Sequence, residues 1–216
     1  MENINTQSIN RDDFAKLIDF DNRHLINAMK EMQLPPQQLP PALTQEELEK
    51  AVERNDVLKW VFVDDELAGY FWLEQKVNYL YISGVAIKEN FHGIGLSQYI
   101  LNLAEEKTKE LHLSSCKLAV IPLNGRAVNA YLKHGYKIIT CVTAFFGPHY
   151  PDSFRFIMEK NLAPDEKASV PRDGQAVSCA DYTQLKNATD RGYVGVRLIR
   201  SESNNNVENK IWFERD

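Results

Sequence analysis

The chain has 216 residues, of which 44% are hydrophobic and 25% charged, and its net charge is −5. These values are typical of a globular protein that is long enough to bury a real core. The acidic balance argues against a broad surface for nucleic acid or membrane.

The cysteines and histidines do not suggest a disulfide framework or a metal site. Cys116, Cys141 and Cys179 lack zinc-ligand spacing, and the first two lie in apolar strand patterns that favour burial over a catalytic thiol. Five scattered histidines also lack ligand spacing. The N-terminus has no signal pattern, and no apolar run approaches the roughly 20 residues that span a bilayer. We therefore expect a cytoplasmic protein with no metal, no membrane contact and no nucleic-acid partner.

The N-terminal part predicts a strand followed by a long helical stretch. Residues 4–9 form the strand, and Asn10 is a good N-cap for a helix, or two helices, reaching about residue 32. The prolines between residues 34 and 41 must end this helix. We interpret that segment as a stiff surface loop rather than a proline-rich ligand.

A second helix and a hairpin follow. Thr44, with Glu47 three residues later, forms a capping box for a helix to about residue 55. Strands are predicted at residues 57–63 and 67–74, joined by an acidic turn at residues 64–66.

The central motif is a strand, a glycine turn and a helix. An apolar strand at residues 79–87 precedes Gly93 and Gly95, and helical spacing then continues to about residue 112. Gly84 inside the strand predicts a bulge or a close approach by another backbone.

The glycine turn has two interpretations. It is either a tight strand-to-helix connection without a ligand, or an anion site formed by free N–H groups at the helix N-terminus. The Rossmann fingerprint requires a third glycine, and the P-loop requires Gly-Lys-Ser/Thr, whereas Leu96 follows Gly95 here. Both of these nucleotide-binding motifs are therefore excluded.

The middle of the chain predicts another strand–helix–strand series. Residues 116–121 form a strand, and a helix begins at Asn124 and ends before Gly135. Two further strands at residues 136–143 and 154–160 are joined by an aromatic loop.

Two of these segments resemble the signatures of the GNAT superfamily of acyl-CoA N-acyltransferases. Residues 90–95, Asn-Phe-His-Gly-Ile-Gly, match motif A, although Gln or Arg is usual at the position of Asn90. The second signature matches at Asn124, Ala127, Tyr131, Lys133, Gly135 and Tyr136. The resemblance covers about residues 1–162. It implies an α/β fold with a mixed, mostly antiparallel central sheet, splayed middle strands and helices on both faces.

The resemblance also implies which residues bind coenzyme A and catalyse transfer. The expected coenzyme-binding positions are Val85, Ala86, Ile87, Asn90, His92, Gly93, Ile94, Gly95, Leu96, Ser97, Asn124, Tyr131 and Lys133. The N–H of Val85 is the expected oxyanion donor. Tyr131, with an ordinary pKa near 10, is the expected general acid for the leaving thiolate.

The general base is left open among several residues. Glu74, Tyr81 and Ser83 are candidates, directly or through an ordered water. Glu89 and His92 lie too near the phosphate loop to be favoured. His149 lies in the aromatic loop, where it could line the acceptor site or simply be a surface residue.

We expect an N-acetyltransferase that moves acetyl from acetyl-CoA to a primary amine of a small molecule or peptide. The alternative is a GNAT-shaped sensor that binds acyl-CoA without turnover, and a longer acyl donor and a homodimer are also kept open. Residues 163–216 form an extension with a linker, a short helix at residues 181–190 and a hairpin of residues 193–199 and 210–213. Its role is either packing or forming a lid or wall for the substrate.

Overall fold

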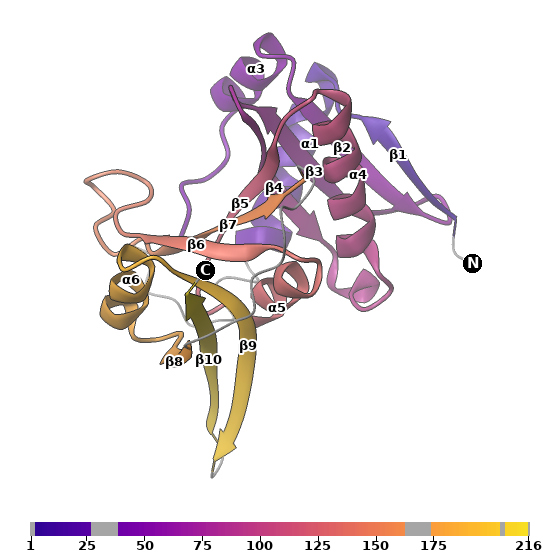
Figure 1. Ribbon diagram of the computed structural model, residues 1–216. Helices are drawn as coiled ribbons and strands as arrows, with labels where there is room; N and C mark the ends of the chain where they lie inside the picture. Colours follow the sequence, from indigo (N-terminus) through magenta and orange to yellow (C-terminus); the bar gives the residue numbers. More distant parts are fainter. Residues whose placement is uncertain (1–2, 27–38, 163–173, 204–205, 216) are drawn as a thin grey trace. The chain divides into compact units, whose positions relative to one another are not determined.

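The computed structural model describes residues 3–26, 39–162, 174–203 and 206–215. The chain divides into two compact units, Met1–Leu113 and Ser114–Asp216 (Figure 1), which are treated separately below. The division into a domain at residues 1–162 and a C-terminal extension at residues 163–216 remains a prediction.

The first unit is built on four antiparallel strands, and the predicted strands are all present. They pair in the order β1 (Ile4–Ser8), β2 (Val57–Val63), β3 (Glu66–Gln75) and β4 (Tyr79–Ile87). Its described helical elements are η1 (Arg11–Asp13), α1 (Phe14–Asp21), η2 (Asn22–Ile26), α3 (Gln45–Glu53), η4 (Glu89–Phe91) and α4 (Leu96–Glu110).

The predicted caps explain where two of these helical segments begin. The Asn10 N–H donates to Asp13 Oδ2 at 3.0 Å, at the start of η1. The Glu47 N–H donates to Thr44 Oγ1 at 3.2 Å, while the Thr44 N–H donates to Glu47 Oε2 at 3.0 Å. This reciprocal capping box confirms the second helix. The end of the predicted first helix and most of the proline-rich segment lie outside the described residues.

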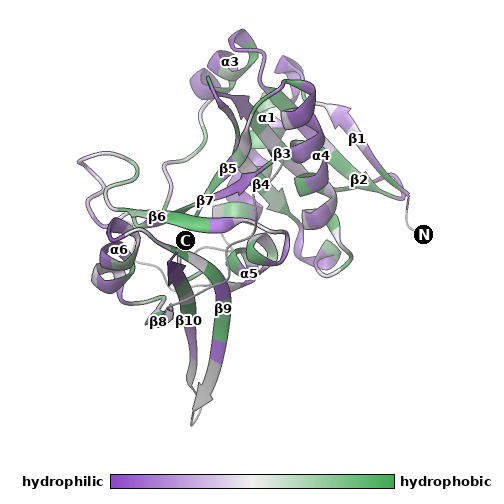
Figure 2. Cartoon of the chain, in the orientation of Figure 1, coloured by the Kyte–Doolittle hydropathy of each residue, from purple (hydrophilic) through white to green (hydrophobic). Residues whose placement is uncertain are grey.

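Helices cover both faces of this sheet. On one face, α1 and α3 pack on β2, β3 and β4 through a buried cluster that includes Leu17, Leu48, Trp60 and Tyr70. On the other face, α4 contacts β4. Figure 2 shows α4 alternating between hydrophobic and hydrophilic residues, as expected for a helix with one buried stripe.

The bulge that Gly84 predicts is present in β4. Trp72 pairs with Gly84 and Leu73 pairs with Ile82, so Ser83 is the extra residue. A Cβ atom at Gly84 would lie 3.1 Å from the Tyr70 hydroxyl, so glycine also permits a close approach of this side chain.

The Tyr70 hydroxyl donates a hydrogen bond to the carboxylate of Asp21, and both residues are buried. Burial is the main cause that raises the pKa of Asp21, and the hydrogen bond from Tyr70 opposes it. The folded chain therefore holds the Asp21 proton more tightly than the unfolded chain. Stability must fall as the pH rises through the window between the ordinary and the raised pKa of this group.

Replacing Asp21 by Asn removes this ionisation. We expect the wild type to gain free energy of unfolding relative to Asp21→Asn as the pH is lowered from about 7 to about 4, because only the wild type takes up the proton. Denaturant unfolding of both proteins across this range measures the difference. Asp19→Asn, at an exposed carboxylate on the same helix, is the control. A pH-independent difference between wild type and Asp21→Asn would contradict the prediction.

The second unit is a six-stranded antiparallel sheet. Its order is β5 (Ser115–Val120), β7 (Arg155–Asn161), β6 (Lys137–Val142), β9 (Tyr193–Ser203), β10 (Asn206–Arg215) and β8 (Gly174–Ser178). Its described helices are α5 (Gly125–Lys133) and α6 (Tyr182–Asp190). The predicted helix and hairpin of the C-terminal part are confirmed, whereas β8 was not predicted.

The C-terminal part continues the sheet rather than forming a separate layer. β9 joins β6 through the pair of Ile138 and Gly195, and a Cβ atom on Gly195 would lie 2.9 Å from Ile138 Cδ1. α6 packs on β6, where the Cys141 N–H donates to Thr189 Oγ1 at 3.3 Å.

The two units confirm the predicted class, an α/β fold with mostly antiparallel strands and helices packed on them. The splaying of the strands at residues 79–87 and 116–121 remains a prediction. Within the described residues, none of the helices combines the length and the apolar character that crossing a bilayer would require.

Candidate active site

The turn between β4 and α4 has the geometry of an anion site. Gly93 and Gly95 have φ angles of +87° and +91°, in the left-handed region where a side chain costs free energy. Gly95 is the N-cap of α4, and this cap makes no side-chain hydrogen bond. The first turn of α4 also lacks acidic residues, so no carboxylate competes for its N–H groups.

The space in front of this turn is open. A Cβ atom added at Gly93 or Gly95 would meet no atom within 4 Å. Backbone conformation, and not packing within the protein, therefore explains both glycines. A pyrophosphate could approach the N–H groups of the turn, so the residues present fit the phosphate end of coenzyme A.

The remaining residues of the motif either hold the turn or border it. Leu96, the first residue of α4, is buried, Ser97 is half-buried, and Asn90, His92 and Ile94 are exposed. The His92 Nε2 atom lies 3.0 Å from the Ile87 carbonyl oxygen, which ties the turn to the end of β4. His92 thus has a local structural contact in addition to its predicted ligand contact.

The end of β4 presents the segment predicted to pair with pantetheine. Ala86 is buried, while Val85 and Ile87 are half-buried. Val85 follows the Ser83 bulge by two residues and pairs with Phe71 of β3. The role of its N–H as oxyanion donor remains a prediction.

The second signature lies in α5 of the other unit. The Ala127 N–H donates to Asn124 Oδ1 at 3.1 Å, which confirms Asn124 as the N-cap. The Asn124 oxygen is therefore engaged, and its amide N–H groups are the donors that it retains for a ligand. Lys133, in the last turn of α5, is exposed.

Tyr131 lies in the middle of this signature and is half-buried. Its ring centroid is 6.2 Å from that of the buried Tyr136. Burial raises the pKa of Tyr131 to about 12, above the ordinary value that the sequence suggested. The hydroxyl is therefore protonated at neutral pH and can act as a donor, but it is a poor base.

Glu74 does not suit the role of a free general base. Its Oε1 atom lies 2.7 Å from Lys76 Nζ and 3.3 Å from an Arg54 nitrogen, and its Oε2 atom accepts a hydrogen bond from Ser83 Oγ at 3.0 Å. Both oxygens are thus engaged, and a proton would displace these partners. The sequence could not indicate this network because Arg54 lies on a different segment of the chain.

The aromatic loop between β6 and β7 is closed by Ser153, which the sequence did not single out. The fully buried Ser153 Oγ donates to the Tyr150 carbonyl at 2.7 Å and accepts from the Phe146 N–H at 3.1 Å. The guanidinium of the buried Arg155 lies 4.8 Å from the centre of the Phe146 ring. His149, on this loop, is exposed.

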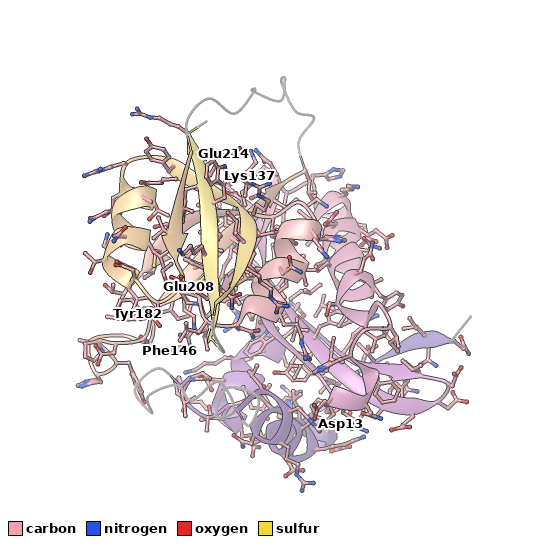
Figure 3. All side chains as sticks on the ribbon, turned by 90° about the horizontal axis from the view of Figure 1, so that it is seen from below. Asp13, Lys137, Phe146, Tyr182, Glu208 and Glu214 are labelled. Carbon is pink, nitrogen blue, oxygen red and sulfur yellow. The ribbon has the colours of Figure 1, made fainter. Side chains whose placement is uncertain are left out.

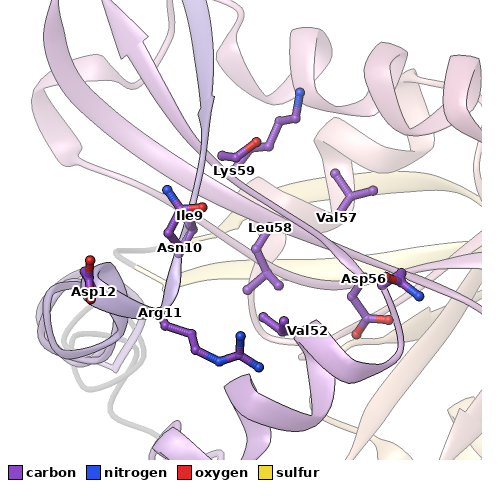
Figure 4. A pocket seen from close by; sticks show the side chains of 11 residues that line it. Ile9, Asn10, Arg11, Asp12, Val52, Asp56, Val57, Leu58 and Lys59 are labelled. Atoms are coloured by element: carbon purple, nitrogen blue, oxygen red, sulfur yellow. The ribbon is translucent and has the colours of Figure 1, made fainter.

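A separate hollow of about 590 Å³ lies in the first unit (Figure 4). It is lined by the end of β1, the start of η1, the end of α3 and the start of β2, including Arg11 and Lys59. None of the predicted site residues lines it. The described residues also contain no cluster of three His, Cys, Asp or Glu side chains that could hold a metal ion.

Comparison with known proteins gives the same family as the resemblance of the two sequence signatures. A family model described as "Acetyltransferase (GNAT) family" matches residues 24–136. No curated protein sequence gives a significant match.

Solved structures share the fold at low identity. The ribosomal-protein-S18-alanine N-acetyltransferase of Escherichia coli superposes with a TM-score of 0.59 at 11% identity, covering 78% of this chain and 100% of its own. The PaiA N-acetyltransferase of Thermoplasma acidophilum, in complex with coenzyme A, gives 0.57 at 17%, covering 74% and 99%. Arabidopsis thaliana Naa50, in complex with the bisubstrate analogue CoA-Ac-MVNAL, gives 0.57 at 13%, covering 73% and 97%. The shared fold thus accounts for about three quarters of the chain.

Proposed function

We propose that the chain, which belongs to the acetyltransferase (GNAT) family, transfers an acetyl group from acetyl-CoA to a primary amine in a ternary complex. The observation that carries this proposal is the open, uncapped glycine turn before α4. Its free N–H groups suit a pyrophosphate, and a structural neighbour is a complex with coenzyme A.

The proposal assigns the binding roles to the backbone and to two side chains. The N–H groups of the turn from Gly93 to Ser97 bind the pyrophosphate, with Asn90, His92 and Ile94 at its border. The segment Val85–Ile87 pairs with the pantetheine amides, and Asn124 donates to the same arm. Lys133 adds a positive charge near the coenzyme.

The chemical step forms one bond and breaks another. The amine nitrogen bonds to the acetyl carbon, the carbon–sulfur bond breaks, and the nitrogen loses one proton. The Val85 N–H stabilises the negative charge on the carbonyl oxygen. Tyr131 donates its hydroxyl hydrogen to the thiolate that leaves. With Glu74 engaged by cations, the proton from nitrogen passes to water, and Tyr131 regains its hydrogen from water after the thiol leaves.

The acceptor belongs to the class of primary amines on small molecules or peptide N-termini. The neighbours include a protein named for N-acetylation of an S18 alanine and one bound to a peptide-containing bisubstrate analogue. We place the reaction in the cytoplasm, in keeping with the three buried free cysteines. The retained Tyr131 favours an enzyme over the alternative, a sensor that binds acyl-CoA without turnover.

The test measures thiol release from acetyl-CoA by the purified chain over a panel of small amines, aminoglycosides and peptides with free N-termini, with acetyl-CoA binding followed by calorimetry. We expect binding in the absence of acceptor and thiol release that depends on one acceptor class. Binding without thiol release on any acceptor would favour the sensor. A chain that does not bind acetyl-CoA would contradict both functions.

A further inference from the structure

The C-terminal part of the second unit reaches the helix that carries Tyr131. Asn209 of β10 lies against Gly125, the first residue of α5, so that a Cβ atom added at Gly125 would be 2.8 Å from Asn209 Nδ2 and 3.4 Å from its Cγ. Gly125 is buried and begins a nine-residue helix. A side chain at this position would require either α5 or the Asn209 side chain to shift.

Gly125 is not required by its backbone conformation. It is absent from the glycines with positive φ, so an alanine could adopt the same φ and ψ. Alanine also forms helices more readily than glycine. The neighbouring Asn209 side chain is therefore the physical reason for a glycine here.

The backbone of Asn209 is fixed by both neighbouring segments of the sheet. Its carbonyl oxygen accepts a hydrogen bond from the Cys179 N–H at 2.8 Å, and its backbone pairs with Arg200 of β9. β9 also packs on α5. The start of α5 thus rests on a strand that is fixed on both sides.

The side chain of Asn209 carries a buried polar atom without a partner among the described residues. Its Oδ1 atom is buried and accepts no hydrogen bond from the described residues. A buried acceptor without a donor lowers the free energy of unfolding. Asn209 therefore makes its close contact with Gly125 at a cost in stability.

We propose that Asn209 is a positioning residue that sets the start of α5, and through this helix the placement of Asn124 and Tyr131. The inference rests on the proposed acetyl transfer. Asn124 directly precedes Gly125, and Tyr131 follows six residues later, about 9 Å along a helix that moves as one piece. A small displacement of a catalytic group can lower a rate by orders of magnitude. The solved neighbours cover about three quarters of this chain.

The same part of the chain also reaches the aromatic loop. The ring of Tyr182, the first residue of α6, stacks on Phe154 at 4.0 Å between centroids and 10° between planes. Figure 3 labels Tyr182 of α6 and, in the aromatic loop, Phe146. The C-terminal part thus contacts both α5, which carries Tyr131, and the end of the aromatic loop. The contact at Asn209 can be tested by changing the size of the two side chains.

The test is a double-mutant cycle on Gly125→Ala and Asn209→Ala, with kcat and thermal stability measured for each folded protein. We expect Gly125→Ala to lower kcat about tenfold, because its methyl group displaces α5 from Asn209. Asn209→Ala should lower kcat about threefold to tenfold without lowering the melting temperature, since it removes an unpaired buried acceptor. In the double variant the new methyl group occupies the vacated space, so kcat should recover relative to Gly125→Ala. Glu208→Ala, at the exposed neighbour on β10 labelled in Figure 3, is the matched control.

The outcomes separate this inference from the proposed function. Additive effects in the cycle, or an Asn209→Ala protein that loses stability and keeps kcat, would overturn the positioning role. If the wild type shows no turnover at all, the proposed function fails, and hydrogen exchange of residues 125–133 decides the inference instead. Faster exchange of α5 in Asn209→Ala than in Glu208→Ala would support it, and equal exchange would overturn it.

Discussion

Replacing Tyr131 by Phe is expected to lower kcat by about two to three orders of magnitude, the usual contribution of a positioned proton donor. The ring keeps its packing 6.2 Å from Tyr136. Only the hydroxyl is lost, so the affinity for acetyl-CoA should change little. Thiol-release kinetics and calorimetry on the same preparation measure the two quantities.

The pH dependence of the wild type adds a second readout for Tyr131. Because burial raises its pKa to about 12, this group is almost fully protonated across the range in which the enzyme can be assayed. The rate should therefore show no loss from its ionisation below about pH 11, where roughly a tenth is ionised. A fall in kcat with a pKa near 10 that disappears in Tyr131→Phe would contradict the raised value.

The control for Tyr131 is Tyr193→Phe, which removes a hydroxyl from a half-buried tyrosine on β9, outside both signatures. We expect this variant to retain the wild-type kcat. If Tyr131→Phe also retained it, leaving-group protonation would have to come from solvent or from the acceptor.

Replacing Gly95 by Ala is expected to weaken acetyl-CoA binding by at least about tenfold. The φ angle of +91° costs a residue with a Cβ roughly 1–2 kcal/mol, and relaxation of this strain would move the N–H groups of the turn away from the pyrophosphate. The added methyl group would also occupy the open space that the ligand requires. Calorimetric titration with acetyl-CoA measures the loss.

Gly192 offers a control with the same strain and no predicted ligand. Its φ angle is +81°, and a Cβ atom there would also meet no atom within 4 Å. Gly192→Ala should therefore lose a similar free energy of unfolding while binding acetyl-CoA normally. Equal affinity of Gly95→Ala and Gly192→Ala would show that the turn before α4 does not bind the ligand.

The sequence predicted the elements whose signals are local. Thr44 and Glu47 bond to each other within one helical turn, and Asn124 bonds within the first turn of α5, so spacing alone was enough to indicate these caps. Gly84 predicted the bulge for a similar reason, because a glycine inside a strand pattern often marks an irregularity in the pairing of that strand. The two glycines of the turn before α4 carry the same kind of signal.

The features that escaped prediction depend on partners far apart in the sequence. β8 is only five residues long and follows a charged segment, so its pairing with β10 leaves no strong pattern. Glu74 looked like a free carboxylate because its bond to Arg54 depends on the path of the chain. Nothing in the sequence relates Asn209 to Gly125, which are 84 positions apart, until the strand and helix are placed together.

The extension of the sheet beyond β6 also bears on how copies of this chain meet. An open strand edge presents unpaired N–H and C=O groups and is a ready template for pairing with a second molecule. Here β9 pairs with β6, and β10 and β8 follow β9 in the sheet. The chain thus supplies its own neighbour to the edge of β6. Association of two copies through β6 would have to displace β9 first, which directs any dimer toward another surface.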